Sequence, residues 1–333
     1  MKAYTISRYS KTAKLQCSEL PQPTVGEHDV LIEVHAAAVN LLDAKIKSGE
    51  FKLLLPYKFP LVLGHDVAGV IVKIGASVKN FKIGDAVYAR PADFRIGTFA
   101  EFIVVNEADV APKPHNISME EAASLPLVAL TAWQALVELA NVQQGQKVFI
   151  QAGSGGVGTI AIQLAKYLGA TVATTASTQN FEWLRKLGAD VLIDYRTQDF
   201  VQILKDYDVA LNSQDSETLQ KSLSVLKKGG KLVSISGPPT PAFARQRGAT
   251  WIVKMIIWLI SRSVCQKAKA GNIDYQFLFM KASGSQLREI KALIEAGVIR
   301  PVIDKVFSFE QTNEALSYVE SGRSKGKVVI KLK

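Results

Sequence analysis

The most constraining feature of the chain is the stretch VFIQAGSGGVGTIAIQLAK at residues 148–166. It places the pattern G-x-G-x-x-G, at Gly153, Gly155 and Gly158, between an apolar run typical of a buried strand and a segment with helical spacing. Four further strand-like runs follow, alternating with helix-like segments, up to about residue 237. This alternation predicts an α/β fold with a doubly wound parallel sheet and helices on both faces.

The glycine loop indicates a dinucleotide site. In such loops the first glycine allows a tight turn, the second lets the backbone approach a pyrophosphate, and the third lets the helix pack closely on the strand. The anion then lies at the N-terminus of the helix. We therefore predict that a dinucleotide contacts Gly153, Ser154, Gly155, Gly156, Val157 and Gly158.

The strand after this loop indicates which dinucleotide is bound. A site selective for NAD carries an acid there that holds the ribose 2′-hydroxyl. Residues 171–181 contain no Asp or Glu but offer the hydroxyls of Ser177 and Thr178, so we expect NADP(H). The loop has no cation before Arg185. Tyr195 either meets the adenine or the 2′-phosphate, or simply packs at the end of its strand.

Residues 1–115 have a different residue pattern. Short runs rich in Val and Ile alternate with Gly and Pro turns, which predicts an all-β unit of the barrel kind. Helical spacing begins near Ser118, and Glu121 completes a capping box with it. This change of pattern separates the all-β unit from the dinucleotide-binding segment that follows.

Composition narrows the class of protein. The 333 residues are 48% hydrophobic and 21% charged, which suits two folded domains and excludes a disordered chain. The start, MKAYTISRYSKTAKLQ, lacks the apolar region of a secretion signal, and no run of about 20 apolar residues occurs. Two cysteines far apart, Cys17 and Cys265, suit reduced thiols. We expect a cytoplasmic protein.

The order of several segments resembles the medium-chain dehydrogenase/reductase superfamily over essentially the whole chain. The segments are GHDVAGVIVKIG, GDAVYA, GTFAEF, LPLVALTAWQAL, AGSGGVG and GKVVI. The resemblance implies a GroES-like β-barrel catalytic domain of residues 1–122 and 273–333, and a Rossmann NADP-binding domain of residues 123–272.

Zinc-dependent members of that superfamily carry a cysteine ligand ahead of the histidine of the GHE motif. Here Asn40 occupies that position, and no cysteine lies between Cys17 and Cys265. His65 and Asp66 supply at most two ligands, whereas a catalytic zinc needs about three from the protein. We expect no zinc, so His65 is either a hydrogen-bonding residue near the site or a satisfied core histidine.

Two further patterns resemble the zinc-independent quinone oxidoreductase branch. Asn40, Asp43 and Gly49 form its N-x-x-D-x-x-x-x-x-G run. The segments ATTAST and LRKLGADVLIDY are similar to plant chloroplast-envelope quinone oxidoreductase homologues and alkenal/enone reductases. Two positions depart from those relatives: Asn180 stands where they usually carry a lysine aimed at the 2′-phosphate, and Lys45 where bacterial members often carry a tyrosine.

The resemblance implies NADPH-dependent hydride transfer to a quinone or to the C=C bond of an enal or enone. Both acceptors build negative charge on a carbonyl oxygen, which hydrogen-bond donors must stabilise when no metal is present. Asn40 is the first candidate donor. Lys45 is a second if it points inward, and a solvated surface lysine otherwise. No residue stands out as the proton donor.

Other cofactor contacts are implied by the resemblance alone. They are Thr131, Ser213, Ser236, Gly237, Phe279 and Lys327. Two alternatives remain open: a zinc-free carbonyl reductase, and an NADPH-binding redox sensor with little turnover. A homodimer is the expectation for the family.

Residues 238–273 form a basic, apolar segment without an acid. Its cations and tryptophans are Arg245, Arg247, Lys254, Arg262, Lys267, Lys269, Trp251 and Trp258. Three roles are open for this segment. It packs over the cofactor cleft and forms an apolar wall for the substrate, or it forms a dimer contact, or its residues 245–269 lie on the surface of an anionic membrane. We expect no nucleic-acid binding, because the cations flank an apolar helix and no known reader motif is present.

Overall fold

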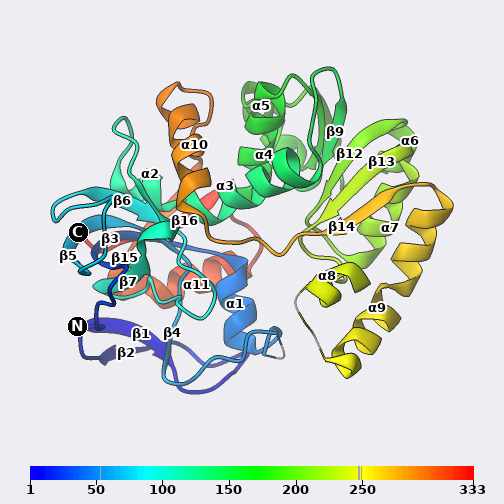
Figure 1. The fold of residues 1–333 in the computed structure, drawn as a ribbon. Coiled ribbons are helices and arrows are strands. Elements are labelled where there is room, and N and C mark those ends of the chain that lie inside the picture. Colours follow the sequence, from blue (N-terminus) through cyan, green and yellow to red (C-terminus); the bar gives the residue numbers. More distant parts are fainter. Residues whose placement is uncertain (53, 247, 249) are drawn as a thin grey trace. The chain divides into compact units, whose positions relative to one another are not determined.

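The computed structural model describes residues 1–52, 54–246, 248 and 250–333, so Arg247 lies outside the described residues (Figure 1). The chain forms two compact units. The first unit comprises Met1–Leu130 and Lys281–Lys333, and the second comprises Thr131–Met280. Both boundaries fall later than the expected positions 122 and 272. The second boundary is later because strand β14 (Asp274–Phe277) pairs with a strand of the second unit.

The first unit is built on two sheets, as the GroES-like expectation requires. The larger has the order β15-β16-β3-β5-β6-β8, with β7 also paired to β3, and the smaller has the order β2-β1-β4. The strands are β1 (Lys2–Ile6), β2 (Gln16–Glu19), β3 (Asp29–Val39), β4 (Leu61–Val62), β5 (Asp66–Ile74), β6 (Ala86–Ala89), β7 (Phe102–Asn106), β8 (Val110–Pro112), β15 (Ile303–Ser308) and β16 (Lys327–Lys331). The helices are α1 (Leu41–Ser48), α2 (Met119–Ala123), α10 (Gly284–Glu295) and α11 (Thr312–Glu320).

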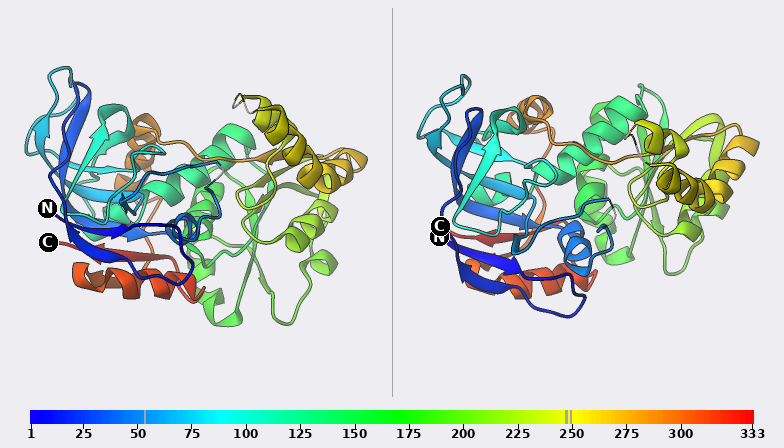
Figure 2. Two further views of the ribbon diagram at one scale, coloured as in Figure 1. Left: turned by 90° about the horizontal axis from the view of Figure 1, so that it is seen from below. Right: turned by 60° about the horizontal axis from the view of Figure 1, so that its bottom comes forward.

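The second unit contains the predicted doubly wound sheet. Its six strands are parallel and have the order β11-β10-β9-β12-β13-β14, with helices on both faces (Figure 2). The remaining strands are β9 (Lys147–Ile150), β10 (Thr171–Ala176), β11 (Val191–Asp194), β12 (Tyr207–Asn212) and β13 (Leu226–Ser234). The helices are α4 (Gly156–Tyr167), α5 (Phe181–Lys186), α6 (Phe200–Ile203), α7 (Ser216–Ser224), α8 (Pro241–Gln246) and α9 (Trp251–Ala270). The strand order reverses between β9 and β12, which is where ligands bind in such sheets.

Two predicted helices have different bounds in the structure. The helical stretch from Ser118 is divided, because Pro126 starts a new helix, α3 (Pro126–Trp133), which continues as a π-helix over Gln134–Leu139. The capping box of Ser118 and Glu121 on α2 is confirmed. The spacing of ETLQKSLSVLKKGG predicts one helix over residues 217–230, but α7 ends at Ser224, because β13 starts at Leu226 to pair with β12.

Candidate cofactor and active site

A buried polar cluster lies in the first unit where β3 meets α1. Lys327, at the start of β16, places its ammonium 3.1 Å from Asp66 Oδ2 and 3.3 Å from the carbonyl of Val39. The same ammonium donates to the side-chain oxygen of Asn40. Asn40, Asp66 and Lys327 are all at least nine-tenths buried. The cluster is therefore a buried ion pair with an amide bridging its two charges.

The amide of Asn40 has a fixed orientation in this cluster. Its oxygen faces Lys327, and its nitrogen donates to Asp66 Oδ2 at 2.9 Å and to the carbonyl of Ala38 at 3.3 Å. The other oxygen of Asp66 accepts the backbone N–H of Leu127 at 2.6 Å. A buried carboxylate and ammonium are tolerated when the remaining lone pairs and protons are hydrogen-bonded, as they are here.

His65 belongs to a neighbouring buried pair. Its Nδ1 lies 2.5 Å from Asp43 Oδ1, and both side chains are fully buried. The second oxygen of Asp43 accepts the backbone N–H of Asn40, which ties this pair to the start of α1. His65 Nε2 is buried and has no hydrogen-bond partner in the described part of the chain. The histidine is thus satisfied on one side only, and its role in the site stays a prediction.

Lys45 is not among the side chains bonded in this cluster. It is half-buried on α1, and no ion pair joins it to a described carboxylate. The cation that reaches Asn40 is Lys327, from the other end of the sequence. Lys327 bonds both Asn40 and Asp66, and these two also bond each other, so the three side chains satisfy one another. Among the described residues, no group of three or more His, Cys, Asp or Glu side chains could hold a metal ion.

The glycine loop of the second unit joins β9 to α4. A Cβ at Gly153 would lie 2.2 Å from Thr174 Oγ1, and one at Gly158 would lie 2.4 Å from the carbonyl oxygen of Ala152. A Cβ at Gly155 would meet only that carbonyl oxygen, at 3.4 Å. The first and third glycines are therefore required by packing, while the second leaves open space at the helix N-terminus. That is the division of roles by which such a loop accommodates a pyrophosphate.

The predicted 2′-phosphate residues lie at the carboxyl edge of β10 and β11. Ser177 is buried and accepts a hydrogen bond from the amide of Asn180, while Thr178 is exposed. Thr178 donates to Asp194, whose pKa is held below its usual range chiefly by this hydrogen bond. Tyr195 is exposed, and the guanidinium of Arg196 lies 5.8 Å from the centre of its ring.

Sequence reasoning missed Asp194 and Arg196, although it considered Tyr195 between them. The signal was present in the segment VLIDYR, because parallel strands end at one edge of a sheet. Ala176 and Asp194 are partners in the register of β10 and β11. The edge therefore presents both an acid and a cation beside Thr178.

The remaining cofactor candidates of the second unit gather at the ends of β9, β12 and β13. Ser213 donates to the carbonyl of Gln151, and Ser236 to the side-chain oxygen of Asn212. The backbone N–H of Gly237 donates to Ser234 Oγ at 2.8 Å. Sequence reasoning missed the buried network of Gln151, Asn212 and Ser234 that supports them.

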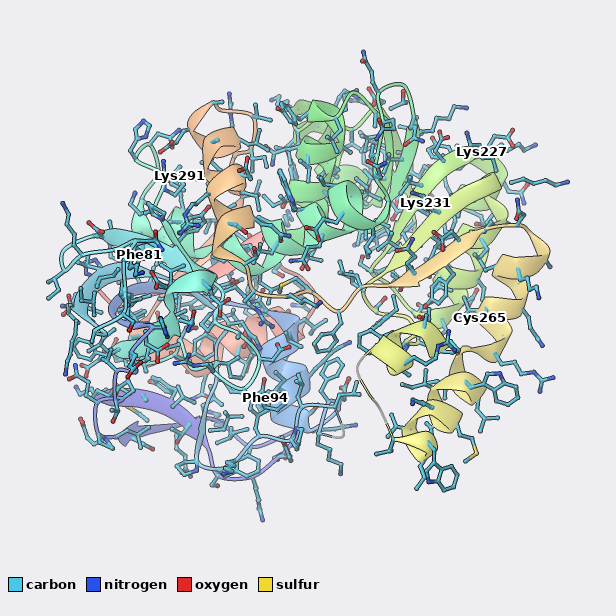
Figure 3. All side chains as sticks on the ribbon, viewed as in Figure 1. Phe81, Phe94, Lys227, Lys231, Cys265 and Lys291 are labelled. Carbon is cyan, nitrogen blue, oxygen red and sulfur yellow. The ribbon has the colours of Figure 1, made fainter. Side chains whose placement is uncertain are left out.

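Two candidates lie close to the unit boundaries. Thr131 is buried in α3. Phe279 follows β14, and its ring centre lies 5.8 Å from that of Phe243 (Figure 3 draws the side chains). The assignment of both to cofactor binding stays a prediction.

Comparison with known proteins decides the family. A sequence profile described as "Alcohol dehydrogenase GroES-like domain" matches residues 26–115, and one described as "Zinc-binding dehydrogenase" matches residues 187–330. The chain is 37% identical to the 2-methylene-furan-3-one reductase of Solanum lycopersicum, over 99% of this chain and 79% of that protein. It belongs to the quinone oxidoreductase branch of the medium-chain dehydrogenase/reductase superfamily.

Two further relatives agree with that placement in the superfamily. The NADPH-dependent alkenal/one oxidoreductase of Arabidopsis thaliana is 36% identical, over 99% of this chain and 79% of that protein. The solved structure of the quinone oxidoreductase from Coxiella burnetii aligns with a TM-score of 0.87 at 30% identity, covering 100% of this chain and 99% of that one. The expected GroES-like and Rossmann folds are thereby confirmed.

Proposed function

We propose that the chain is an NADPH-dependent, zinc-independent oxidoreductase that transfers a hydride to quinones or to the C=C bond of enals and enones. The observation that carries the proposal is the glycine loop. Gly153 and Gly158 lie too close to neighbouring atoms to admit a side chain, whereas Gly155 leaves open space. The relatives named for alkenal, furanone and quinone reduction support the acceptor class.

The second unit supplies the residues that would hold the cofactor. The backbone of residues 153–158 would face the pyrophosphate, and the helix N-terminus of α4 would complement its charge. In this proposal Thr178 and Arg196 would contact the 2′-phosphate, which is supported by their position beside Asp194 and Tyr195. When bound, NADPH supplies the hydride, and the protein supplies position and field.

The first unit supplies a polar cluster that carries a cation in place of a metal. The ammonium of Lys327 polarises the amide of Asn40 by bonding its oxygen, which makes the amide N–H a stronger donor. Negative charge developing on an acceptor carbonyl would be stabilised by such a donor. In this proposal the Asn40 N–H that makes only the 3.3 Å bond to the Ala38 carbonyl donates to the acceptor carbonyl instead. Lys327 and Asp66 hold the amide in orientation.

The test follows the loss of NADPH absorbance with a short 2-enal, a simple quinone and an aldehyde side by side, with EDTA throughout. We expect oxidation of NADPH with the enal or the quinone, and a loss of at least about tenfold in kcat for Asn40→Ala. Turnover of the aldehyde alone would make the chain a carbonyl reductase. Binding of NADPH without turnover of any acceptor would make it a sensor, and turnover only after zinc is restored would overturn the proposal.

We further propose that the protein is a cytoplasmic homodimer. Reduced thiols support the compartment, since both cysteines are free. Strand β14 supports the dimer, because it is an edge strand that pairs only with β13 in the described sheet. Light scattering after gel filtration tests the dimer, and fractionation of the source cells tests the compartment.

A further inference from the structure

Helix α9 exposes an unusual amount of apolar surface. Seven large apolar side chains of its N-terminal half are between 46% and 72% exposed. They are Trp251, Ile252, Met255, Ile256, Trp258, Leu259 and Ile260. In this half only Ile257 is buried.

The C-terminal half of α9 is anchored to the second unit. Ile257, Ser261, Val264 and Ala268 form a narrow buried stripe along the helix, and α9 contacts α7, α8 and β14. Val264 and Ala268 belong to the core cluster around Phe149, and Cys265, labelled in Figure 3, packs against it. The N-terminal half extends past the sheet (Figures 1 and 2). The helix is therefore fixed to the second unit while its N-terminal half keeps its apolar surface exposed.

The same segment is cationic. Arg245 precedes the helix, Lys254 lies within its apolar half, and its remaining cations, Arg262, Lys267 and Lys269, follow. None of these five makes an ion pair with a described carboxylate, and Arg262 stacks over Trp258 at 5.4 Å. Residues 238–273 contain no acid. The segment thus combines exposed tryptophans and aliphatic side chains with unneutralised positive charge.

Charge distinguishes the two partners that could cover this apolar surface, which are a second copy of the chain and a lipid bilayer. A second copy of the chain docked helix to helix would bring two cationic segments together, and like charges across an interface cost several kcal/mol. An anionic lipid surface instead neutralises the cations, at about 1 kcal/mol for each Lys or Arg near it. Tryptophans and aliphatic side chains on one helix with cations are typical of helices that lie in the membrane interface. No helix in the described ranges is long and apolar enough to cross a membrane.

We propose that the N-terminal half of α9 docks on an anionic phospholipid bilayer. Its apolar side chains enter the interface, and Lys254, Arg262 and Lys269 contact the phosphate headgroups. This docking does not depend on the proposed reaction, and its failure would leave the enzymatic assignment untouched.

The first experiment is sedimentation of the full chain with vesicles of phosphatidylcholine alone or mixed with phosphatidylglycerol. We expect the bound fraction to give a partition coefficient at least about tenfold higher with the anionic lipid, and to fall in high salt. Equal partition to both vesicles, or no binding to either, would overturn the proposal.

Variants locate the contact on α9. Trp251→Ser with Ile256→Ser, and separately Lys254→Glu with Lys269→Glu, are each expected to lower the anionic partition coefficient at least about tenfold. The matched controls lie on exposed positions of the first unit: Ile83→Ser for the apolar pair, and Lys11→Glu with Lys14→Glu for the charge pair. NADPH oxidation in solution should be unchanged in all four. Equal losses in the controls would mean that net charge or general hydrophobicity drives binding, which contradicts a site on α9.

The depth to which α9 enters the bilayer is tested by tryptophan quenching with brominated phosphatidylcholine in the anionic vesicles. Trp251 and Trp258 are two of the four tryptophans in the chain, so quenching should be strong and should largely disappear in Trp251→Phe with Trp258→Phe. Quenching that survives this double change would place another part of the chain in the membrane. If the serine pair turns a dimer into a monomer and leaves vesicle binding intact, the occupant is a second copy and the proposal is wrong.

Discussion

At the scale of single residues, the site depends on charges that are buried in pairs. Lys327 and Asp66 are separated by most of the sequence, yet each meets the other's charge inside the first unit. The penalty for burying either alone is several kcal/mol, so each is tolerated only with its partner. The polar positions of the Asn40 cluster are therefore structural requirements as well as candidate functional ones.

The change Lys327→Met tests this dependence. It leaves the carboxylate of Asp66 buried without a cation, so we expect a loss of about 3–5 kcal/mol in the free energy of unfolding, measured in urea. Adding Asp66→Asn should restore a large part of the loss. Lys331→Met is the control on the same strand, where the exposed pair with Glu120 should contribute at most about 1 kcal/mol. Equal costs at the two lysines would contradict a buried charge pair.

Arg196 provides the residue-level test of cofactor choice. If its guanidinium contacts the 2′-phosphate, Arg196→Ala should weaken NADPH binding about tenfold, or about 1.4 kcal/mol, and leave NADH binding unchanged. Asp194→Asn should shift the preference toward NADPH, because it removes a negative charge beside Thr178. Fluorescence titration with both nucleotides measures the two ratios. Parallel losses for NADPH and NADH would show that Arg196 supports the fold of the edge instead.

At the scale of elements, two short segments fix the positions of the helices around the sites. The glycine loop sets how closely α4 approaches β9, since the third glycine lies against the backbone of Ala152. In the first unit, Glu295 ends α10 and accepts hydrogen bonds from Lys291 and from the backbone N–H of His115. These contacts hold α10 to a loop distant in sequence.

The glycines of the loop should separate folding from binding. Gly158→Ala forces a Cβ against the carbonyl of Ala152, so we expect a loss of about 1–3 kcal/mol in unfolding free energy. Gly155→Ala meets no close atom and should fold like the wild type, but it should weaken NADPH binding about tenfold, because its methyl group enters the space for the pyrophosphate. Unchanged NADPH affinity in folded Gly155→Ala would contradict the assignment of this loop to the pyrophosphate.

Glu295 gives a prediction for acid stability. Its hydrogen bonds from Lys291 and from the His115 backbone lower its pKa from 4.5 to about 2. A lowered pKa means that the stabilisation is present above pH 4.5 and is lost as the pH falls from there to about 2. We expect Glu295→Gln to cost about 1–2 kcal/mol at neutral pH and almost nothing near the acid end. Exposed Glu289→Gln on the same helix is the control, and a difference that grows toward low pH would contradict the assignment.

At the scale of the whole molecule, the chain is two units with separate cores. The first is interrupted in sequence by the second, which is a single continuous segment. The cofactor loop and the 2′-phosphate candidates lie entirely in the second unit, while the Asn40 cluster lies entirely in the first. Ligand binding should therefore act on the stability of one unit in particular.

NADPH is expected to stabilise the second unit. A ligand that binds only the folded state at 100 times its Kd adds about 2.7 kcal/mol. For a unit of this size that corresponds to an increase of about 5–10 °C in Tm. Calorimetry with NADPH, NADH and EDTA measures it: NADPH should give the largest shift and EDTA none. A large drop in Tm with EDTA would show a bound metal on which the fold depends.

The sequence by itself determined the two kinds of fold and the glycine loop. Strand and helix periodicity, turn glycines and capping residues such as Ser118 act over a few neighbouring positions, so they can be recognised in order along the chain. The order of segments likewise led to the superfamily, which the relatives confirm. The prediction that Ser177 and Thr178 contact the 2′-phosphate followed from the same kind of local pattern.

Only the tertiary structure decided which charges meet. Strand pairing brings Lys327 to Asn40 and Asp66 across long separations that no local pattern encodes. It also decided that β14 belongs to the second unit and that α9 leaves its apolar half exposed. These features depend on register and burial, which are set by the packing of distant elements and by the cost of leaving a buried charge or polar group without a partner.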